Sequence, residues 1–405
     1  MKKIVLTGGG TAGHVTPNIA LIPTLKEEGY DIHYIGSYNG IEKKLLEDLD
    51  IPYYGISSGK LRRYFDVKNF ADPFRVIKGY SQACSLLRKI KPDVVFSKGG
   101  FVSVPVVLAA KHRRIPTIIH ESDITPGLAN KICIPGATKV CANFPETLKH
   151  LPAGKAELTG TPIRAELFTG NKQKGLDFCG FNNEKPVLLV IGGSLGSIAV
   201  NNAIRDYLTD ILKDFQVIHL CGKGKKFDSL DGHKGYVQFE YIQKELCDLL
   251  SCADIVVSRA GANAICELLA LNKPNILIPL SAASSRGDQI LNAASFAKQG
   301  FSYVIQEEEI VGDTLLKAIH EVYENRQQYI DTMSQSGSKD SIKTIVRMIN
   351  ELATPASKDA VSDIASEPDN SNNNTATDNQ ETTDSNNSDN KNQEAIDGNK
   401  ADNKN

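Results

Sequence analysis

Short apolar runs alternate with stretches of helical periodicity from the start of the chain to about residue 353. Residues 4–6 and 32–35 are predicted to be buried strands, and residues 19–26 between them are predicted to be helical. Strands that alternate with helices in this way are typical of a parallel sheet covered by helices on both faces. The pattern therefore predicts an α/β fold.

The order of strand, glycine turn and helix occurs twice, first in residues 4–14 and again in residues 186–197. A chain of 405 residues is also long enough for two hydrophobic cores. We therefore predict two Rossmann-like domains whose parallel sheets face each other across a cleft. The expected boundaries are residues 1–165 for the first domain, 166–185 for a polar linker and 186–353 for the second domain.

The composition changes at residue 354. Residues 354–405 are mainly Asn, Asp, Ser and Thr, and they cannot bury enough apolar surface to offset the entropy cost of ordering. We expect a disordered acidic tail there. The tail holds 11 acidic residues and 4 lysines, which leaves 42 basic and 37 acidic residues in the remainder of the chain. This mild basic excess does not predict nucleic-acid binding.

Basic and aromatic residues are interleaved in residues 60–91, where nine Lys and Arg face only two Asp. This composition suits the anionic inner face of a membrane, where each basic side chain contributes about 1 kcal/mol. The alternative is a solvated helix face whose aromatic residues enter the core. The residues expected to meet a membrane are Arg62, Arg63, Phe65, Phe70, Phe74 and Lys78.

The cysteines and the apolar runs bear on the compartment. The eight cysteines include no Cys-x-x-Cys pair, so we expect them to be reduced core residues. No apolar run approaches the roughly 18 residues that span a bilayer, and the chain begins in a strand and not in a signal peptide. A cytoplasmic protein is expected. No group of residues has the spacing of metal ligands, and we expect no metal.

The glycine turn at residues 8–13 is a candidate binding site. A strand, a glycine turn and a helix N-terminus make an anion-binding corner, because unpaired N–H groups and the helix dipole favour negative charge. The alternative is a plain connection, with His14 as a helix-end residue and not a base. The turn matches Gly-x-Gly-x-x-Gly only loosely, and no acidic residue is suitably placed for the ribose of NAD, which disfavours a dehydrogenase.

The second half contains a similar corner. Arg259 follows a predicted strand, Gly261 precedes a predicted helix, and together they suit a pyrophosphate. Glu267, about two helical turns on, suits the two hydroxyls of a ribose. The alternative is a surface ion pair between Arg259 and Glu267. In the first half, residues 120–123 also follow a strand, where parallel sheets bind ligands or where a helix is capped.

Several motifs occur in an order that resembles the MurG family of glycosyltransferases, over about residues 1–350. They are Gly-Gly-Thr-Ala-Gly-His at 9–14, Lys-Gly-Gly-Phe-Val-Ser at 98–103, His-Glu-Ser-Asp at 120–123, Gly-Leu-Ala-Asn-Lys at 127–131, Gly-Thr-Pro-Ile-Arg at 160–164, Gly-Gly-Ser-Leu-Gly at 192–196, Ser-Arg-Ala-Gly-Ala at 258–262 with Glu267, and Asp-Gln with Asn-Ala at 288–293. The resemblance implies a GT-B fold and transfer of N-acetylglucosamine from UDP-N-acetylglucosamine, without a cofactor.

The resemblance also implies roles for single residues. Ser194 would contact a donor phosphate, Arg259 would offset the diphosphate charge, Ile242 would hold uracil through its backbone, and Glu267 would bind the ribose. Gln289, beside Asp288, would read the sugar hydroxyls. The implied donor-binding residues are Thr11, Gly13, Arg164, Ser194, Ile242, Arg259, Gly261, Glu267 and Gln289, and the implied acceptor-binding residues are Gly10, Thr11, His14, Glu121 and Asp123.

The implied acceptor is the undecaprenyl-diphosphate-linked muramoyl-pentapeptide at the cytoplasmic face of the bacterial cell membrane, where the protein would be peripheral. Other cell-wall synthesis proteins are candidate partners. His14 is the expected base, with Glu121 as the alternative. Asp123 departs from the commoner family pattern, which has Asn, and we hypothesise that this change follows the acceptor peptide. The other functions considered are a diacylglycerol sugar transferase and a non-enzymatic membrane scaffold.

Overall fold

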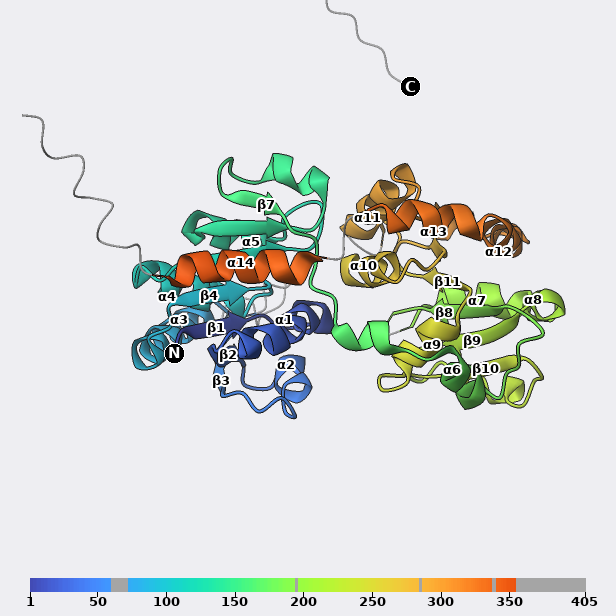
Figure 1. The fold of residues 1–405 in the computed structure, drawn as a ribbon, viewed down its shortest axis with the longest axis horizontal. Helices are drawn as coiled ribbons and strands as arrows, with labels where there is room; N and C mark the ends of the chain where they lie inside the picture. Colours follow the sequence, from blue (N-terminus) through green and yellow to red (C-terminus); the bar gives the residue numbers. More distant parts are fainter. Residues whose placement is uncertain (60–71, 194–195, 284–285, 337–339, 355–405) are drawn as a thin grey trace, which may run out of the picture. The chain divides into compact units, whose positions relative to one another are not determined.

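We describe a computed structural model of the chain, which places residues 1–59, 72–193, 196–283, 286–336 and 340–354. Within these residues, two parallel sheets are formed, one of seven strands and one of six (Figure 1). The first sheet contains β1 (Lys3–Thr7), β2 (Asp31–Ser37), β3 (Tyr53–Ile56), β4 (Val94–Ser97), β5 (Thr117–Glu121), β6 (Lys139–Ala142) and β7 (Ala156–Leu158). The second sheet contains β8 (Val187–Ile191), β9 (Gln216–Leu220), β10 (Tyr236–Phe239), β11 (Ile255–Ser258), β12 (Asn275–Leu277) and β13 (Tyr303–Val304). The apolar runs of the sequence therefore form the predicted strands.

Helices cover both faces of the first sheet. On one face, α1 (Thr16–Glu27) packs over Ile4 and Leu6 of β1. On the other face, α3 (Asp72–Ile90) and α4 (Ser103–His112) pack over Val5. The α5 helix (Leu128–Cys133) continues this second layer. Since successive side chains of a strand point to opposite faces, apolar residues at consecutive positions are needed when both faces are covered. The remaining α-helix of this half is the short α2 (Ile41–Leu45).

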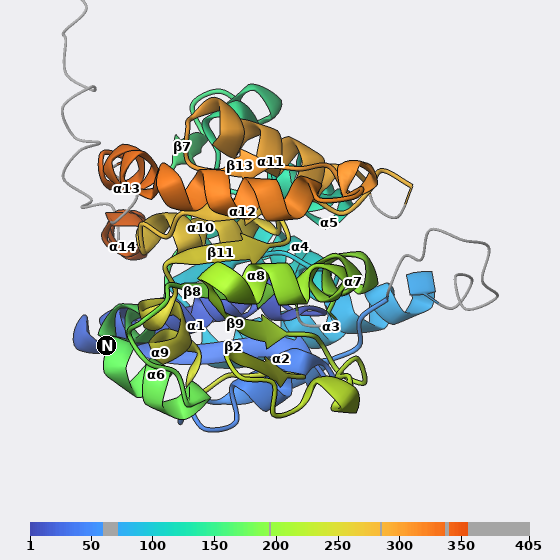
Figure 2. The ribbon, with the colours of Figure 1, turned by 90° about the vertical axis from the view of Figure 1, so that its right-hand side faces the viewer.

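The second sheet is covered in the same way (Figure 2). One layer packs over Leu188 and Val190, and the other packs over Val187 and Leu189. The first layer consists of α7 (Ile198–Asp206), α8 (Leu208–Asp214) and α12 (Thr314–Glu324). The second consists of α6 (Lys172–Cys179), α9 (Leu246–Cys252) and part of α10 (Ala262–Ala270). The last helices of this half are α11 (Asp288–Lys298) and α13 (Arg326–Ser334).

Two segments pack in ways that the predicted boundaries do not describe. The expected linker at 166–185 contains α6, whose Leu176 and Cys179 enter the second core, so part of this segment belongs to that core. The α14 helix (Ser341–Ala353) lies at the end of the predicted second domain, but its apolar face packs with the first core, beside α1 (Figure 1). Periodicity shows which face of a helix is buried but not which sheet buries it. The predicted tail, apart from Thr354, lies outside the described residues.

Candidate active site

Each glycine turn lies where the strand order of its sheet reverses. The first sheet has the order β3-β2-β1-β4-β5-β6-β7, so the reversal falls between β1 and β4. The second has the order β10-β9-β8-β11-β12-β13, with the reversal between β8 and β11. Open parallel sheets bind ligands beyond the carboxyl ends of their strands at such points. The ends of β1 and β8, where the two glycine turns begin, are therefore both at binding positions.

A cavity of about 1070 Å³ lies against the first glycine turn. The predicted acceptor residues Gly10, Thr11, His14, Glu121 and Asp123 all line it. The other lining residues come from the first half of the chain, except for the second-half residue Arg286: Gly9, Ser37, Tyr38, Asn39, Gly40, Ile41, Ile56, Ser57, Ser58, Gly59, Arg75, Gly100, Phe101, Val102, Gly127, Leu128, Ala129, Asn130 and Arg286. Sequence positions far apart thus form one cavity.

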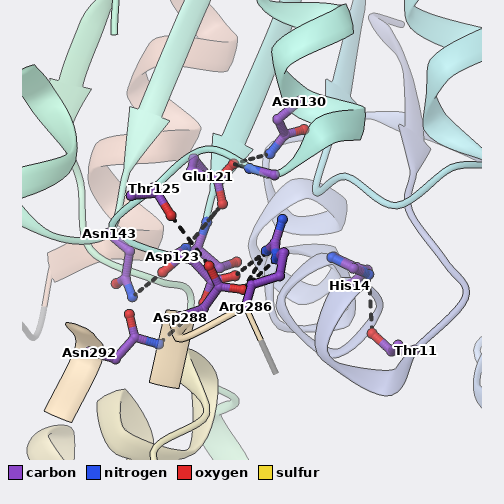
Figure 3. Close-up of polar contacts among 12 residues, drawn as sticks. Thr11, His14, Glu121, Asp123, Thr125, Asn130, Asn143, Arg286, Asp288 and Asn292 are labelled. Atoms are coloured by element: carbon purple, nitrogen blue, oxygen red, sulfur yellow. Dashed lines mark hydrogen bonds and ion pairs between the residues drawn. The ribbon is translucent and has the colours of Figure 1, made fainter. Parts of the chain in front are cut away.

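His14 ends a 3-10 turn (Ala12–His14), and its Nδ1 lies 3.1 Å from the hydroxyl of Thr11 (Figure 3). Burial, and next the positive charge of Lys98, lower the pKa of His14 to about 4. The Gly9 backbone and the charge of Glu42 act in the opposite direction. At neutral pH the imidazole is therefore uncharged, which is the form that can accept a proton.

Glu42 is a buried residue that contacts the first glycine turn. Glu42 was not identified from the sequence. Its side chain is fully buried and accepts hydrogen bonds from the Gly10 amide at 3.2 Å, the Ser37 amide at 2.8 Å and the Ser37 hydroxyl at 2.5 Å. A side chain at Gly9 or Gly40 would overlap the Glu42 carboxylate. The absence of side chains at these glycines therefore lets one carboxylate hold two loops together.

Glu121 holds the loop that follows β5. One carboxylate oxygen accepts the amides of Ser122 at 2.8 Å and Asp123 at 3.0 Å, and the other accepts the Gly127 amide at 3.0 Å and the Asn130 side chain at 2.8 Å. Burial raises the pKa of Glu121, while these hydrogen bonds oppose the shift. Because four donors already occupy both oxygens, Glu121 is poorly placed as the alternative base.

Asp123 joins the two halves of the chain (Figure 3). One oxygen accepts a hydrogen bond from Asn292 at 3.2 Å, and the other lies 3.9 Å from the guanidinium of Arg286. Arg286 also pairs with Asp288 at 2.5 Å, and Asp288 accepts a hydrogen bond from Thr125 at 3.3 Å. Burial raises the pKa of Asp123. The predicted acceptor residue thus lies in a polar cluster built from both halves.

Arg259 is buried at the second glycine turn. Its guanidinium donates to Ser197 at 2.6 Å and to the carbonyls of Ile278 and Pro279, and it forms an ion pair with Glu307. The alternative of a surface pair between Arg259 and Glu267 is wrong, because Arg259 pairs with another carboxylate. Glu307 therefore balances the charge of Arg259, and the hydrogen bond to Ser197 connects Arg259 to the second glycine turn.

Glu267 instead faces Arg164, with 3.5 Å between the two charged groups. Burial raises the pKa of Glu267, and Arg164 opposes that shift. Both residues were predicted on the donor side, and the structure brings them together. One helical turn earlier, Asn263 donates to the Gly13 carbonyl at 2.7 Å, which links α10 to the first glycine turn. Gly261 forms the N-terminal cap position of α10.

The remaining predicted donor residues are in three situations. Gln289 accepts a hydrogen bond from the Leu280 amide at 3.0 Å, so its side chain oxygen holds the preceding loop. Ile242 packs partly buried against the second core. Ser194 lies outside the described residues. The described residues contain no group of three or more His, Cys, Asp and Glu placed to hold a metal ion.

The described part of the predicted membrane surface lies on α3. Phe74 is 75% exposed, Ile77 is 64% exposed, and Lys78 is also exposed, so the first turns of α3 present apolar and basic side chains to solvent. Arg62, Arg63, Phe65 and Phe70 lie outside the described residues. Along the ranges that the structure places, no helix is both long and apolar enough to cross a membrane.

Known structures with the same architecture confirm the predicted GT-B fold. A crystal structure of MurG from Acinetobacter baumannii has a TM-score of 0.67 at 24% identity, over 87% of this chain and 100% of that one. The UDP-GlcNAc 2-epimerase of Methanocaldococcus jannaschii has a TM-score of 0.62 at 17% identity, over 87% of this chain and 100% of that one. At these identities the likeness concerns the fold alone.

Sequence comparison gives the family. The model of the glycosyltransferase family 28 N-terminal domain matches residues 4–142, and that of the C-terminal domain matches residues 187–347. Proteins from Lachnoclostridium phytofermentans and Lachnospira eligens, each named UDP-N-acetylglucosamine--N-acetylmuramyl-(pentapeptide) pyrophosphoryl-undecaprenol N-acetylglucosamine transferase, are 68% and 66% identical over 352 and 351 residues. The alignments cover 87% of this chain and 99% of each relative. The chain therefore belongs to the MurG family, within glycosyltransferase family 28.

Proposed function

We infer that this chain transfers N-acetylglucosamine from UDP-N-acetylglucosamine to the lipid-linked muramoyl-pentapeptide, the step from lipid I to lipid II in peptidoglycan synthesis. The observation that carries this proposal is the 68% identity, over nearly the full length, to a relative that bears the name of this transferase. The two glycine turns at the reversal points of the two sheets support it, because they offer one binding position for each of the two substrates.

The acceptor occupies the cavity of about 1070 Å³ in the first half. The first glycine turn binds the diphosphate of the acceptor, and the C4 hydroxyl of the muramoyl residue lies near His14. This hydroxyl attacks C1 of the donor sugar in line, the bond from C1 to the UDP oxygen breaks, and the configuration at C1 inverts. His14 takes the hydroxyl proton, a role that its neutral ring at pH 7 supports.

The donor lies against the second glycine turn and α10. Backbone N–H groups of the turn stabilise the negative charge that develops on UDP, as fixed donors do in other group transfers. Arg259 and Ser197 hold this turn in shape, and Glu267, oriented by Arg164, accepts hydrogen bonds from the ribose. Asn263 keeps α10 close to the first turn through its bond to Gly13. Ser194, Ile242 and Gln289 keep the roles that the resemblance implies.

The membrane surface of the first half brings the enzyme to its acceptor. Phe74 and Lys78 on α3 are exposed and suit an anionic bilayer, the former by its apolar area and the latter by its charge. The protein is then peripheral at the cytoplasmic face of the cell membrane, where other cell-wall synthesis proteins are accessible to it. No metal or cofactor takes part in the reaction as we describe it.

Product analysis tests the proposed function. The purified protein is incubated with UDP-N-acetylglucosamine and the lipid-linked muramoyl-pentapeptide, and the lipid products are identified by mass spectrometry. We expect one added N-acetylhexosamine per acceptor and an equal amount of UDP. Transfer to diacylglycerol under the same conditions, without transfer to the muramoyl lipid, would assign the chain to a different lipid glycosyltransferase activity. Absence of UDP-sugar binding in calorimetry would favour a scaffold.

A further inference from the structure

Lys98 is a buried lysine next to the segment 120–123, and the proposed mechanism does not use it. It follows β4 directly, at the reversal point of the first sheet, and it is only 1% exposed. Its Nζ lies 2.8 Å from Nδ1 of His120 and also donates to the hydroxyl of Ser122. Both partners belong to the segment that carries Glu121 and Asp123 into the cavity.

The second nitrogen of His120 defines the direction of these hydrogen bonds. Nε2 lies 2.8 Å from the carbonyl of Gly160, which can only accept, so Nε2 carries the ring proton. Nδ1 is then an acceptor, and Lys98 is its donor. Burial, and next the charge of Lys98, hold the pKa of His120 well below its usual value, in agreement with a neutral ring. Lys98, His120 and Gly160 therefore form one directed chain.

Charged and titratable groups face the Lys98 ammonium from several elements. Glu121 is the last residue of β5, Asp123 lies in the loop after it, Cys141 comes from β6 and Cys266 comes from α10. Burial lowers the pKa of Lys98 to about 8, and these groups oppose the shift. Burying an ammonium is unfavourable, so an apolar side chain of similar length would serve the core better. The position of Lys98 calls for a role other than core packing.

We propose that Lys98 is a positioning residue for the acceptor: by holding Ser122 and His120, it fixes the loop that presents Glu121 and Asp123 to the cavity. This inference rests on the proposed function and deepens it, because it assigns the floor of the acceptor site. Lys98 does not line the cavity, so it acts through the loop and not by contact with substrate. It also adds positive charge near His14, together with Arg286 and against Glu42.

The test is Lys98→Met, which keeps the length of the side chain and removes its charge and donors. Hydrogen bonds from charged groups are among the stronger ones, so we expect the KM for the lipid acceptor to rise about tenfold or more. The KM for UDP-N-acetylglucosamine and the Kd for UDP, measured by calorimetry, should stay within about twofold. The matched control is Lys273→Met. Lys273 also has a burial-lowered pKa, but it donates to the carbonyls of Ser251 and Ala253 in the second half.

A second readout separates positioning from a general loss of fold. The pKa of His14, followed by NMR titration with His14→Gln as the assignment control, should move up from its low value in Lys98→Met and not in Lys273→Met. This titration needs no turnover, so it remains informative if the proposed function fails. If Lys98→Met does not fold, Ser122→Ala removes one acceptor of the same network and should raise the acceptor KM to a smaller extent.

An unchanged acceptor KM in folded Lys98→Met would overturn the inference. It would also be overturned if the KM of the donor rose as much as that of the acceptor, or if Lys273→Met had the same effect on the acceptor, because each result would indicate a general structural effect.

Discussion

Glu42 offers the sharpest test of how the first glycine turn is held. Glu42→Gln keeps the size of the side chain and replaces one carboxylate oxygen with an amide group. The remaining oxygen can still accept from Ser37, but the new NH₂ group then faces the Gly10 amide, which is also a donor. One buried hydrogen bond is therefore lost, and two donors are left facing each other.

A hydrogen bond to a charged group contributes about 1.5–3 kcal/mol, so Glu42→Gln should lower the free energy of unfolding by about that amount. Glu42→Ala removes all three hydrogen bonds of a fully buried carboxylate and should cost roughly 3–5 kcal/mol. The turn also carries Thr11 and His14. A displacement of about 1 Å at a reacting group can reduce the rate about a hundredfold, so kcat/KM should fall at least tenfold in Glu42→Gln.

Urea unfolding gives the stability change, and steady-state transfer to the lipid acceptor gives kcat/KM. The control is Glu47→Gln on the exposed surface nearby, which should change stability by less than about 0.5 kcal/mol. If Glu42→Gln unfolds and turns over like the wild type, the carboxylate does not hold the turn and our reasoning about the site is wrong.

Three further predictions concern other parts of the molecule. The pKa of His14 is lowered to about 4 from an unfolded value near 6.5, so its contribution to stability is present above pH 6.5 and is lost as the pH falls through about 4. With this pKa, kcat/KM should fall about twofold near pH 4 and about tenfold per pH unit below it, and a profile that stays flat to about pH 3 would exclude His14 as the base. Glu307→Gln removes the ion pair of the buried Arg259 and should weaken UDP binding about tenfold, measured by calorimetry. Unchanged UDP binding would show that this ion pair does not hold the second glycine turn in shape. Phe74→Asp and Ile77→Asp on exposed positions of α3 should reduce sedimentation with anionic vesicles several-fold while UDP affinity stays the same, and undiminished sedimentation would remove α3 from the membrane surface.

The sequence by itself determined the strands and the glycine turns. The predicted strands at residues 4–6 and 32–35 lie within β1 and β2. This is possible because an apolar run that is buried on both faces is a local property of the chain. The repeated plan of strand, glycine turn and helix likewise predicted two Rossmann-like domains, and the motifs within it predicted the family. Five of the residues that line the cavity near His14 were also named from those motifs: Gly10, Thr11, His14, Glu121 and Asp123.

Only the tertiary structure decided how charged residues are paired. The sequence assigned no role to Glu42 and offered a pair between Arg259 and Glu267 as an alternative, whereas the fold brings Glu42 to Gly10 and Arg259 to Glu307. The fold also places α14 against the core of the first half. These contacts join residues tens to hundreds of positions apart, and local periodicity carries no information about such partners. These contacts depend on which loops meet beyond the ends of the two sheets. The packing of the helices on the sheets decides which loops meet.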